Sequence, residues 1–160
     1  MGEPHVVTLR ATRDGDLDAL FTFEQDEAAV QMAAFTPPDP SDRVTFDAHW
    51  RRLLADPSID ARTVRADGRV VGSVARWYDE GTAEITYWID PEHWGEGIGT
   101  RAVRLFLDAL HERPVRVRVA ADNARSIAIL EKLGFRQVGT DRGFANARGT
   151  EVEERIYLLD

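Results

Sequence analysis

The sequence predicts a single α/β domain of the α+β type, in which helices flank a mixed, mostly antiparallel central sheet. Three observations support this fold class. The chain has 160 residues, 43% of them hydrophobic, which suits one domain with a sizeable core. Apolar residues alternate with a period of two between residues 61 and 89, and they recur at helical spacing on both sides of that stretch. No repeat or break divides the sequence, so one domain over residues 1–160 is expected.

The first third of the chain predicts one strand and two helices. Residues 5–12 (HVVTLRAT) are rich in β-branched side chains, and residues 14–16 (Asp-Gly-Asp) offer turn and capping chemistry before a first helix. Prolines in residues 35–41 lack N–H donors, so this segment is expected to be a loop. The polar pair at 41–42 can cap the second helix, which closes at residues 56–57 (Asp-Pro).

The rest of the chain predicts a meander followed by alternating helices and strands. ARTVRA, RVVGSVARWY and AEITYWI alternate apolar and polar positions, and glycine-containing turns separate them. The spacing then becomes helical from about residue 98 to 112, before Pro114. A strand (VRVRVA), a helix (ARSIAILEKL) and two strands (FRQVGT and VEERIYLL) complete the expected order.

Composition and charge exclude several classes of protein. Lys and Arg number 20 against 28 Asp and Glu, a net charge of −8, so no binding to the phosphate backbone of nucleic acids is expected. No apolar stretch approaches the roughly 20 residues of a membrane-spanning helix, and the N-terminus lacks a basic region followed by an apolar one, so a cytoplasmic protein without membrane contact is expected. Cysteine is absent. No metal site is expected, because the histidines are scattered without ligand spacing: His5, His49, His93 and His111.

A glycine-rich segment, Trp94-Gly95-Glu96-Gly97-Ile98-Gly99-Thr100, lies between a predicted strand and a predicted helix. Glycines let the backbone turn sharply and approach a ligand closely, and the helix N-terminus that follows presents unpaired N–H groups and the positive end of its dipole. An anion such as a diphosphate suits this place. The spacing fits neither the P-loop nor the dinucleotide-binding fingerprint, and a plain capping turn would carry the same glycines.

A second motif follows the glycine-rich segment. Residues 123–126 (Asn-Ala-Arg-Ser) open a predicted helix that ends in residues 131–135 (Glu-Lys-Leu-Gly-Phe). Together the two motifs resemble the signature of the GNAT N-acetyltransferase superfamily, which joins a pyrophosphate loop, a strand, an Asn-led helix and a Leu-Gly-Phe exit. The resemblance is close over residues 83–141 and the element order matches along the whole chain. The sequence looks most like the ribosomal-protein alanine N-acetyltransferase (Rim-type) branch.

This resemblance implies a single N-acetyltransferase domain with acetyl-coenzyme A as its cofactor. Amides of the loop would surround the pyrophosphate, and a splayed pair of strands would admit the pantetheine arm between them. The backbone of Ile89 would also face the thioester carbonyl. The family's usual Arg or Gln at the head of the loop is Trp94 here. The implied cofactor-binding residues are Trp88, Ile89, Gly95, Glu96, Gly97, Ile98, Gly99, Thr100, Asn123 and Ser126.

Acetyl transfer needs one group that takes a proton from the amine and another that assists the leaving thiolate. Glu84, in a strand otherwise built of β-branched and aromatic residues, is the candidate base, and its alternative role is an ion pair with Arg76. Many family members carry a Tyr where this chain has Leu130, so the resemblance suggests Ser126 as the acid. Its alternative role is to satisfy a backbone amide in the first helical turn. Tyr87, on the strand face opposite to Glu84, is a further candidate.

The sequence leaves the acceptor open. The leading hypothesis is an N-acetyltransferase in which a primary amine attacks the thioester directly, and the alternative is a non-catalytic acyl-CoA-binding sensor or interaction module of the same fold. Residues 24–40, which link the first two helices, are expected to form one wall of the acceptor site, and residues 142–150 the opposite wall. A protein N-terminus, a polyamine or an aminocyclitol would suit such a site, and the chain could form a homodimer.

Overall fold

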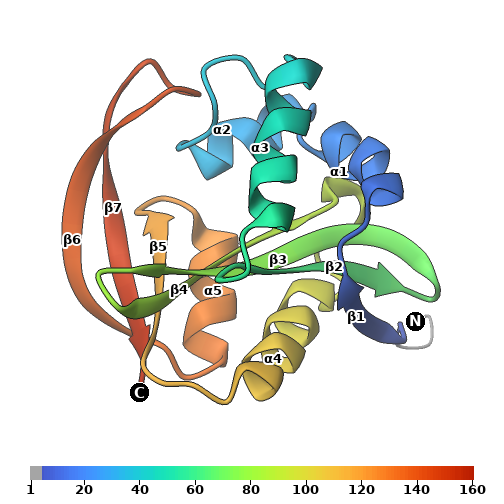
Figure 1. Cartoon of the computed structure of the whole chain (residues 1–160). Helices are drawn as coiled ribbons and strands as arrows, with labels where there is room; N and C mark the ends of the chain where they lie inside the picture. The colour runs from blue at the N-terminus through green and yellow to red at the C-terminus, as the bar shows by residue number, and fades with distance from the viewer. Residues whose placement is uncertain (1–4) are drawn as a thin grey trace.

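The computed structural model describes residues 5–160, so the first four residues of the predicted domain lie outside the described part. Its sheet of seven strands has the order β1-β2-β3-β4-β5-β7-β6, and Figure 1 shows α1, α2 and α3 on one side of β2–β4 and α4 and α5 on the other. This confirms the predicted fold class.

The elements are β1 (Val7–Ala11), the 3-10 turn η1 (Asp14–Asp16), α1 (Leu17–Phe23), α2 (Glu27–Ala33), α3 (Arg43–Ala55), β2 (Asp60–Ala66), β3 (Arg69–Asp79), β4 (Thr82–Ile89), the 3-10 turn η2 (Pro91–His93), α4 (Ile98–Leu110), β5 (Val115–Ala120), α5 (Ala124–Lys132), β6 (Arg136–Ala145) and β7 (Thr150–Leu159).

Two apolar cores lie on opposite faces of the sheet. The larger core joins α4 and α5 to the strands, and its buried members include Ile85, Phe106 and Leu130. The smaller core packs α1 and α3 through Leu17, Leu20 and Trp50. Since side chains alternate along a strand, the same strands serve both cores. Among the described residues, no helix is long and apolar enough to cross a membrane.

A buried polar cluster fixes the start of α1 against the sheet. The Asp16 carboxylate accepts hydrogen bonds from Arg10 at 2.7 and 2.8 Å, from the Arg13 backbone N–H at 2.9 Å and from the Thr63 hydroxyl at 2.7 Å. The Arg10 guanidinium holds the pKa of Asp16 well below its usual range. Because this cluster sets the path of α1, it also sets the position of Glu24, the residue at the C-terminal cap of that helix.

Strands β4 and β5 diverge after a short parallel pairing. They pair only at Ala83↔Val115 and Glu84↔Arg116, although β4 continues to Ile89 and β5 to Ala120. On its other side β4 stays paired with β3 from Thr82 to Ile89. The predicted splayed strand pair is therefore present, and it leaves the facing backbone edges of β4 and β5 without a partner strand.

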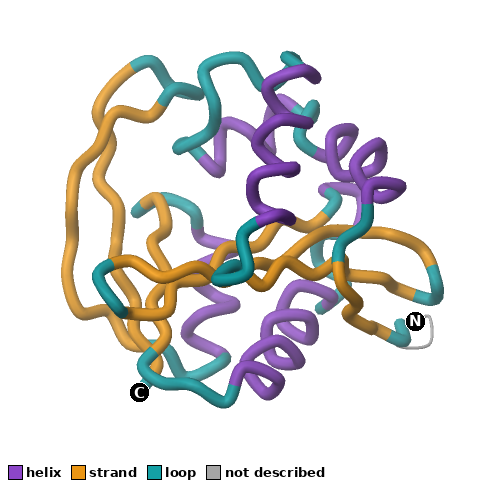
Figure 2. Tube along the Cα trace, in the orientation of Figure 1, coloured by secondary structure: helices purple, strands orange, loops and turns teal. Residues whose placement is uncertain are grey.

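One connecting segment differs from the sequence-based expectation, and a second packs against it. Residues 27–33 form the helix α2 rather than a simple link, because Asp26 caps it by accepting from the Ala29 backbone N–H at 2.8 Å. Residues 142–150 as the opposite wall of the acceptor site stay a prediction. They belong to the long hairpin of β6 and β7, whose turn bonds to the α2 segment, with Ala147 N–H donating to the Ala34 carbonyl at 3.2 Å (Figure 2).

Gly72 is expected to be indispensable for the approach of β3 to the end of β4. A Cβ at this position would lie 2.2 Å from the Trp88 carbonyl oxygen, a backbone atom that cannot turn aside. We expect Gly72→Ala to destabilise the fold by about 3 kcal/mol. Urea unfolding measures this, with Gly15→Ala as the control because a Cβ there meets nothing within 4 Å. Equal stabilities of the two variants would contradict the prediction.

Candidate active site

The glycine-rich segment forms a turn that runs into the N-terminus of α4. Gly95 and Gly97 have φ angles of 84° and 77°, in the left-handed region that glycine adopts without strain. Gly97 is the N-cap of α4 and no side chain caps that helix, so the N–H groups of its first turn can serve an acceptor from outside. Gly99 has another role, because a Cβ there would lie 3.0 Å from Ile129 Cδ1 in α5. It allows α4 and α5 to pack closely.

The implied cofactor residues gather at the open end of the gap between β4 and β5. Trp88 and Ile89 end β4, Gly95, Glu96 and Gly97 form the turn, Ile98, Gly99 and Thr100 begin α4, and Asn123 and Ser126 cap and open α5. A cavity lies among these segments and under α2. It is lined by Ala29, Met32, Ala33, Tyr87, Trp88, Ile89, Trp94, Asn123, Arg125, Ser126 and Ile129. Of the implied residues, Trp88, Ile89, Asn123 and Ser126 line it directly.

Trp94 connects the loop to β4 and supports a guanidinium group. Its indole N–H donates to the Ile89 carbonyl at 3.0 Å, so the protein itself already uses that carbonyl. The guanidinium carbon of Arg125 lies 3.8 Å from the centroid of the Trp94 ring, in a cation–π contact. No carboxylate of the described residues pairs with Arg125. The family's cationic side chain is missing at Trp94, and α5 brings a cation to the same place, which the sequence motif did not reveal.

Tyr87 and Ser126 meet across the cavity. The Tyr87 phenol from β4 is hydrogen-bonded to the Ser126 hydroxyl in the first turn of α5. Asn123, not Ser126, caps the helix, since its side-chain oxygen accepts from the Ser126 backbone N–H at 3.2 Å. The Ser126 hydroxyl is therefore directed at Tyr87 rather than at a backbone amide. Burial raises the pKa of Tyr87 to about 12, so the phenol is a protonated donor at neutral pH.

Glu84 is buried and held by two guanidinium groups. Arg116 Nε donates to Glu84 Oε1 at 2.7 Å, and Arg118 Nε lies 3.4 Å from the same oxygen. The alternative of a pair with Arg76 is wrong, because Arg76 donates to Glu112 at 2.8 Å instead. Glu84 as the general base stays a prediction. Its carboxylate borders a cavity that continues from the cofactor side, but the guanidinium groups already occupy one of its oxygens.

Glu24, at the C-terminal end of α1, is a second carboxylate near β4. It borders a cavity of about 290 Å³ between α3 and the strands β3 and β4. Burial raises the pKa of its carboxyl group to about 7. The sequence placed Glu24 in an acidic wall of the acceptor site without distinguishing it from its neighbours, because its burial depends on how α1 ends against α3. The cavity is lined by Glu24, Val30, Thr36, Pro37, Asp39, Pro40, Asp42, Thr45, Phe46, His49, Trp50, Arg52 and Leu53, with Ser73, Ala75, Thr86, Tyr87 and Trp88 from the sheet.

Two buried polar atoms in this cavity lack a partner among the described residues. They are the indole nitrogen of Trp88 and the hydroxyl of Thr36. The residues that carry them, Trp88 and Thr36, line the cavity beside Glu24. Since buried polar groups are normally hydrogen-bonded, these two atoms stand out as unsatisfied in the described part of the chain.

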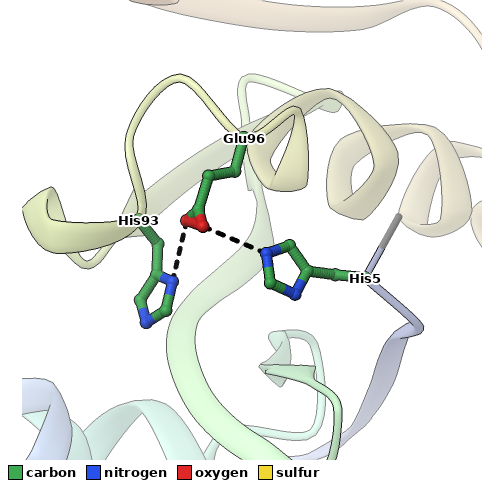
Figure 3. Close-up of side chains that lie close together, drawn as sticks. All are labelled: His5, His93 and Glu96. Carbon is green, nitrogen blue, oxygen red and sulfur yellow. Dashed lines mark hydrogen bonds and ion pairs between the residues drawn. The ribbon is translucent and has the colours of Figure 1, made fainter. Parts of the chain in front are cut away.

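Two of the scattered histidines are neighbours in space. His5 and His93 both contact the carboxylate of Glu96 in the glycine-rich loop (Figure 3). Sequence spacing could not indicate this, because the residues meet only when β1 pairs in the sheet. His49 borders the acceptor-side cavity and His111 ends α4, so these two stay apart from the cluster.

Comparisons with known proteins agree with this geometry. The family model described as an acetyltransferase (GNAT) domain matches residues 7–136. The uncharacterized N-acetyltransferase p20 of Bacillus licheniformis is 25% identical over 166 residues, covering 96% of this chain and 92% of the relative. N-alpha-acetyltransferase RimI of Mycobacterium tuberculosis is 29% identical over 130 residues, covering 78% and 80%.

A solved structure, Mycobacterium smegmatis RimJ in complex with CoA-disulfide, superposes with a TM-score of 0.82 at 22% identity, covering 96% of this chain and 81% of that one. That likeness confirms the fold, and the match of the family model extends over most of the chain. The chain therefore belongs to the GNAT acetyltransferase family and is an N-acetyltransferase, with acetyl-CoA as its acetyl donor.

Proposed function

We propose that this chain moves the acetyl group to a primary amine held between α3 and β4, as the amine attacks the thioester directly. The observation that carries the proposal is the continuity of the cavities around β4. Tyr87 and Trp88 line the cofactor-side cavity, the acceptor-side cavity and the one between them. A donor and an acceptor that entered from the two sides would meet at these residues.

The residues present fit a long, phosphorylated cofactor. Acetyl-CoA supplies an acetyl group that is activated as a thioester. The uncapped N-terminus of α4 and the guanidinium of Arg125 offer N–H donors and positive charge for a diphosphate. The unpartnered edges of β4 and β5 offer backbone groups to an extended chain, as a sheet edge does for an added strand.

Two carboxylates compete for the role of general base, and the geometry favours Glu24 over Glu84. A base must be free to accept a proton near neutral pH. Burial raises the pKa of Glu24 to about 7, and Glu24 borders the cavity that the amine would occupy. Glu84 is held by Arg116 and Arg118 at the start of the strand gap. In this proposal Glu84 positions β5, and Glu24 takes the proton.

The leaving thiolate would be stabilised by the pair of Tyr87 and Ser126. A thiol has an ordinary pKa of about 8.5, so full proton transfer from a phenol of pKa about 12 is uphill. Hydrogen bonds to the developing thiolate are the more favourable contribution. Tyr87 and Ser126 share one hydrogen bond already, and either hydroxyl can turn its proton toward the sulfur.

The acceptor cavity favours an amine whose neighbouring atoms accept a hydrogen bond. Glu24 suits the amine, and the unpartnered Trp88 indole N–H suits a carbonyl oxygen next to it. The apolar wall of Phe46, Trp50 and Leu53 suits a small side chain. An N-terminal residue of a peptide combines these three features, and the name of the relative RimI, an N-alpha-acetyltransferase, points the same way.

We expect thiol release from acetyl-CoA to depend on an amine and to be faster with peptides that begin in a small residue than with spermidine. A peptide carbonyl can accept from the Trp88 indole, whereas a polyamine offers only donors. Free thiol is measured against a panel of peptides, spermidine and aminocyclitols. If none of the amines on the panel supports thiol release, the transferase proposal is contradicted. A preference for spermidine would overturn only the proposed class of acceptor.

Glu24→Gln is expected to lower the turnover rate by about 10²- to 10⁴-fold, as loss of a general base commonly does. In the wild type the rate should rise with pH through about 7, because the carboxyl group acts only after it has lost its proton. That rise should disappear in the variant. Glu84→Gln is the matched comparison, expected to lower the melting temperature and to keep the rate per folded molecule. If Glu84→Gln loses the rate and its rise with pH while Glu24→Gln keeps both, Glu84 is the base and the proposal for Glu24 is wrong.

Tyr87→Phe and Ser126→Ala are expected to slow turnover less than Glu24→Gln does, while acetyl-CoA affinity stays the same. The melting temperature of Ser126→Ala should change little, because Asn123 caps α5. Asn123→Ala serves as the structural control, with an expected loss of about 0.5–2 kcal/mol in stability. Calorimetry, steady-state rates and thermal unfolding on the same preparations test this. If both Tyr87→Phe and Ser126→Ala turn over at the wild-type rate, the proposal that these hydroxyls stabilise the thiolate is contradicted.

A further inference from the structure

Three segments that are distant in the sequence meet beside the glycine-rich loop. His5 precedes β1, Asp67 lies in the turn between β2 and β3, and His93 and Glu96 lie between β4 and α4. Pairing of β1 with β2 brings the first two together. The Asp67 backbone N–H donates to the Val6 carbonyl at 2.9 Å, and the Val6 N–H donates to the Asp67 carboxylate at 2.9 Å. The position of His5 is therefore fixed by the sheet.

The imidazole rings converge on one carboxylate (Figure 3). His5 Nε2 lies 3.0 Å from Glu96 Oε1, and His93 Nδ1 lies 2.9 Å from Glu96 Oε2. One ligand atom from each of the three residues lies within 4.8 Å of the others. A tetrahedral Zn²⁺ ion holds its nitrogen and oxygen ligands at about 2.0–2.2 Å, which places such ligands roughly 3.5 Å apart. The three atoms can reach this arrangement through small side-chain movements.

Asp67 supplies the outer partner that a histidine ligand of zinc usually has. Its carboxylate lies 2.6 Å from His5 Nδ1, the nitrogen on the far side of the ring from Glu96. Metal-bound imidazoles commonly donate their second N–H to a carboxylate in this way, which fixes the ring and its tautomer. The hydrogen bond from the Val6 N–H holds Asp67 in turn. His5 is thus already oriented to offer Nε2 to an ion.

Charge and access also suit a cation. The carboxylates of Asp67 and Glu96 carry two negative charges, and Arg101, which donates to the carbonyls of His5 and Glu96, offsets one of them. The side chains of His5, His93 and Glu96 are 27%, 28% and 37% exposed, so an ion can enter from solvent and keep water as a fourth ligand.

We propose that His5 Nε2, His93 Nδ1 and the Glu96 carboxylate bind one Zn²⁺ ion, with Asp67 orienting His5. The ion would fasten the start of β1 to the loop that precedes α4. Two imidazoles with one carboxylate are a ligand set that zinc prefers, whereas Mg²⁺ prefers oxygen ligands alone. The proposed ligand from the loop is the Glu96 side chain, and binding needs neither acetyl-CoA nor an acceptor, so zinc binding can be measured without the transfer reaction.

The test is a titration of the full chain, freed of any polyhistidine tag and of metal, with Zn²⁺ in competition with a chromogenic chelator. We expect one equivalent to bind. His5→Gln and His93→Gln should each weaken binding at least about 10-fold, and Asp67→Asn should weaken it about 10- to 100-fold, as loss of an outer carboxylate does. His111→Asn is the control, because His111 lies outside the cluster, and it should bind like the wild type. Mg²⁺ should not compete.

Thermal unfolding separates loss of the site from loss of the fold. Zn²⁺ should raise the melting temperature of the wild type and of His111→Asn, and should leave that of His93→Gln unchanged. All variants should unfold cooperatively without the ion. The proposal is overturned if the wild type does not bind Zn²⁺, or if His5→Gln and His93→Gln bind it as tightly as the wild type does. The cluster would then be a set of ion pairs between imidazole and carboxylate groups.

Discussion

The early end of the pairing between β4 and β5 is the constraint on which the site depends. The strands run parallel and pair at two positions, and the second of these joins Glu84 to Arg116. The ion pair between those side chains lies at the point where the strands separate, so it holds the strands together there and nowhere further along. Beyond it, the space opens that Trp88, Asn123 and Ser126 border. If the two strands paired along their whole length, this space would be closed.

Different segments supply the charged side chains on the two sides of β4. Tyr87 points toward α5, where Arg125 and the start of α4 supply positive charge and N–H donors, while Glu24 borders the cavity on the α3 side. Arg125 and Glu24 thus line different cavities beside one strand. The overall charge of −8 would not reveal this division, because it sums both sides.

The sequence predicts the framework well because its signals are local. Period-two alternation located β2, β3 and β4, the polar residues at 41–42 marked the cap of α3, and the glycine-rich segment marked the start of α4. It missed α2, since a helix of seven residues leaves little periodicity. It selected Glu84 as the candidate base because a carboxylate in an apolar strand is conspicuous, and it gave Glu24 no separate role because burial at the end of α1 depends on distant packing. The meeting of His5 with His93 and the stacking of Arg125 on Trp94 depend on tertiary structure in the same way.

The separation of β4 from β5 also has a consequence for solubility. A sheet edge with free N–H and C=O groups is a template on which another protein chain can add, and exposed edges of this kind lead to aggregation. This fold carries two extra edges inside the sheet, facing each other across a narrow gap. Residues of α2 and α5 line the cavity at the end of this gap, so these helices cover part of the free edges. The two helices therefore reduce the exposure of these edges to neighbouring molecules.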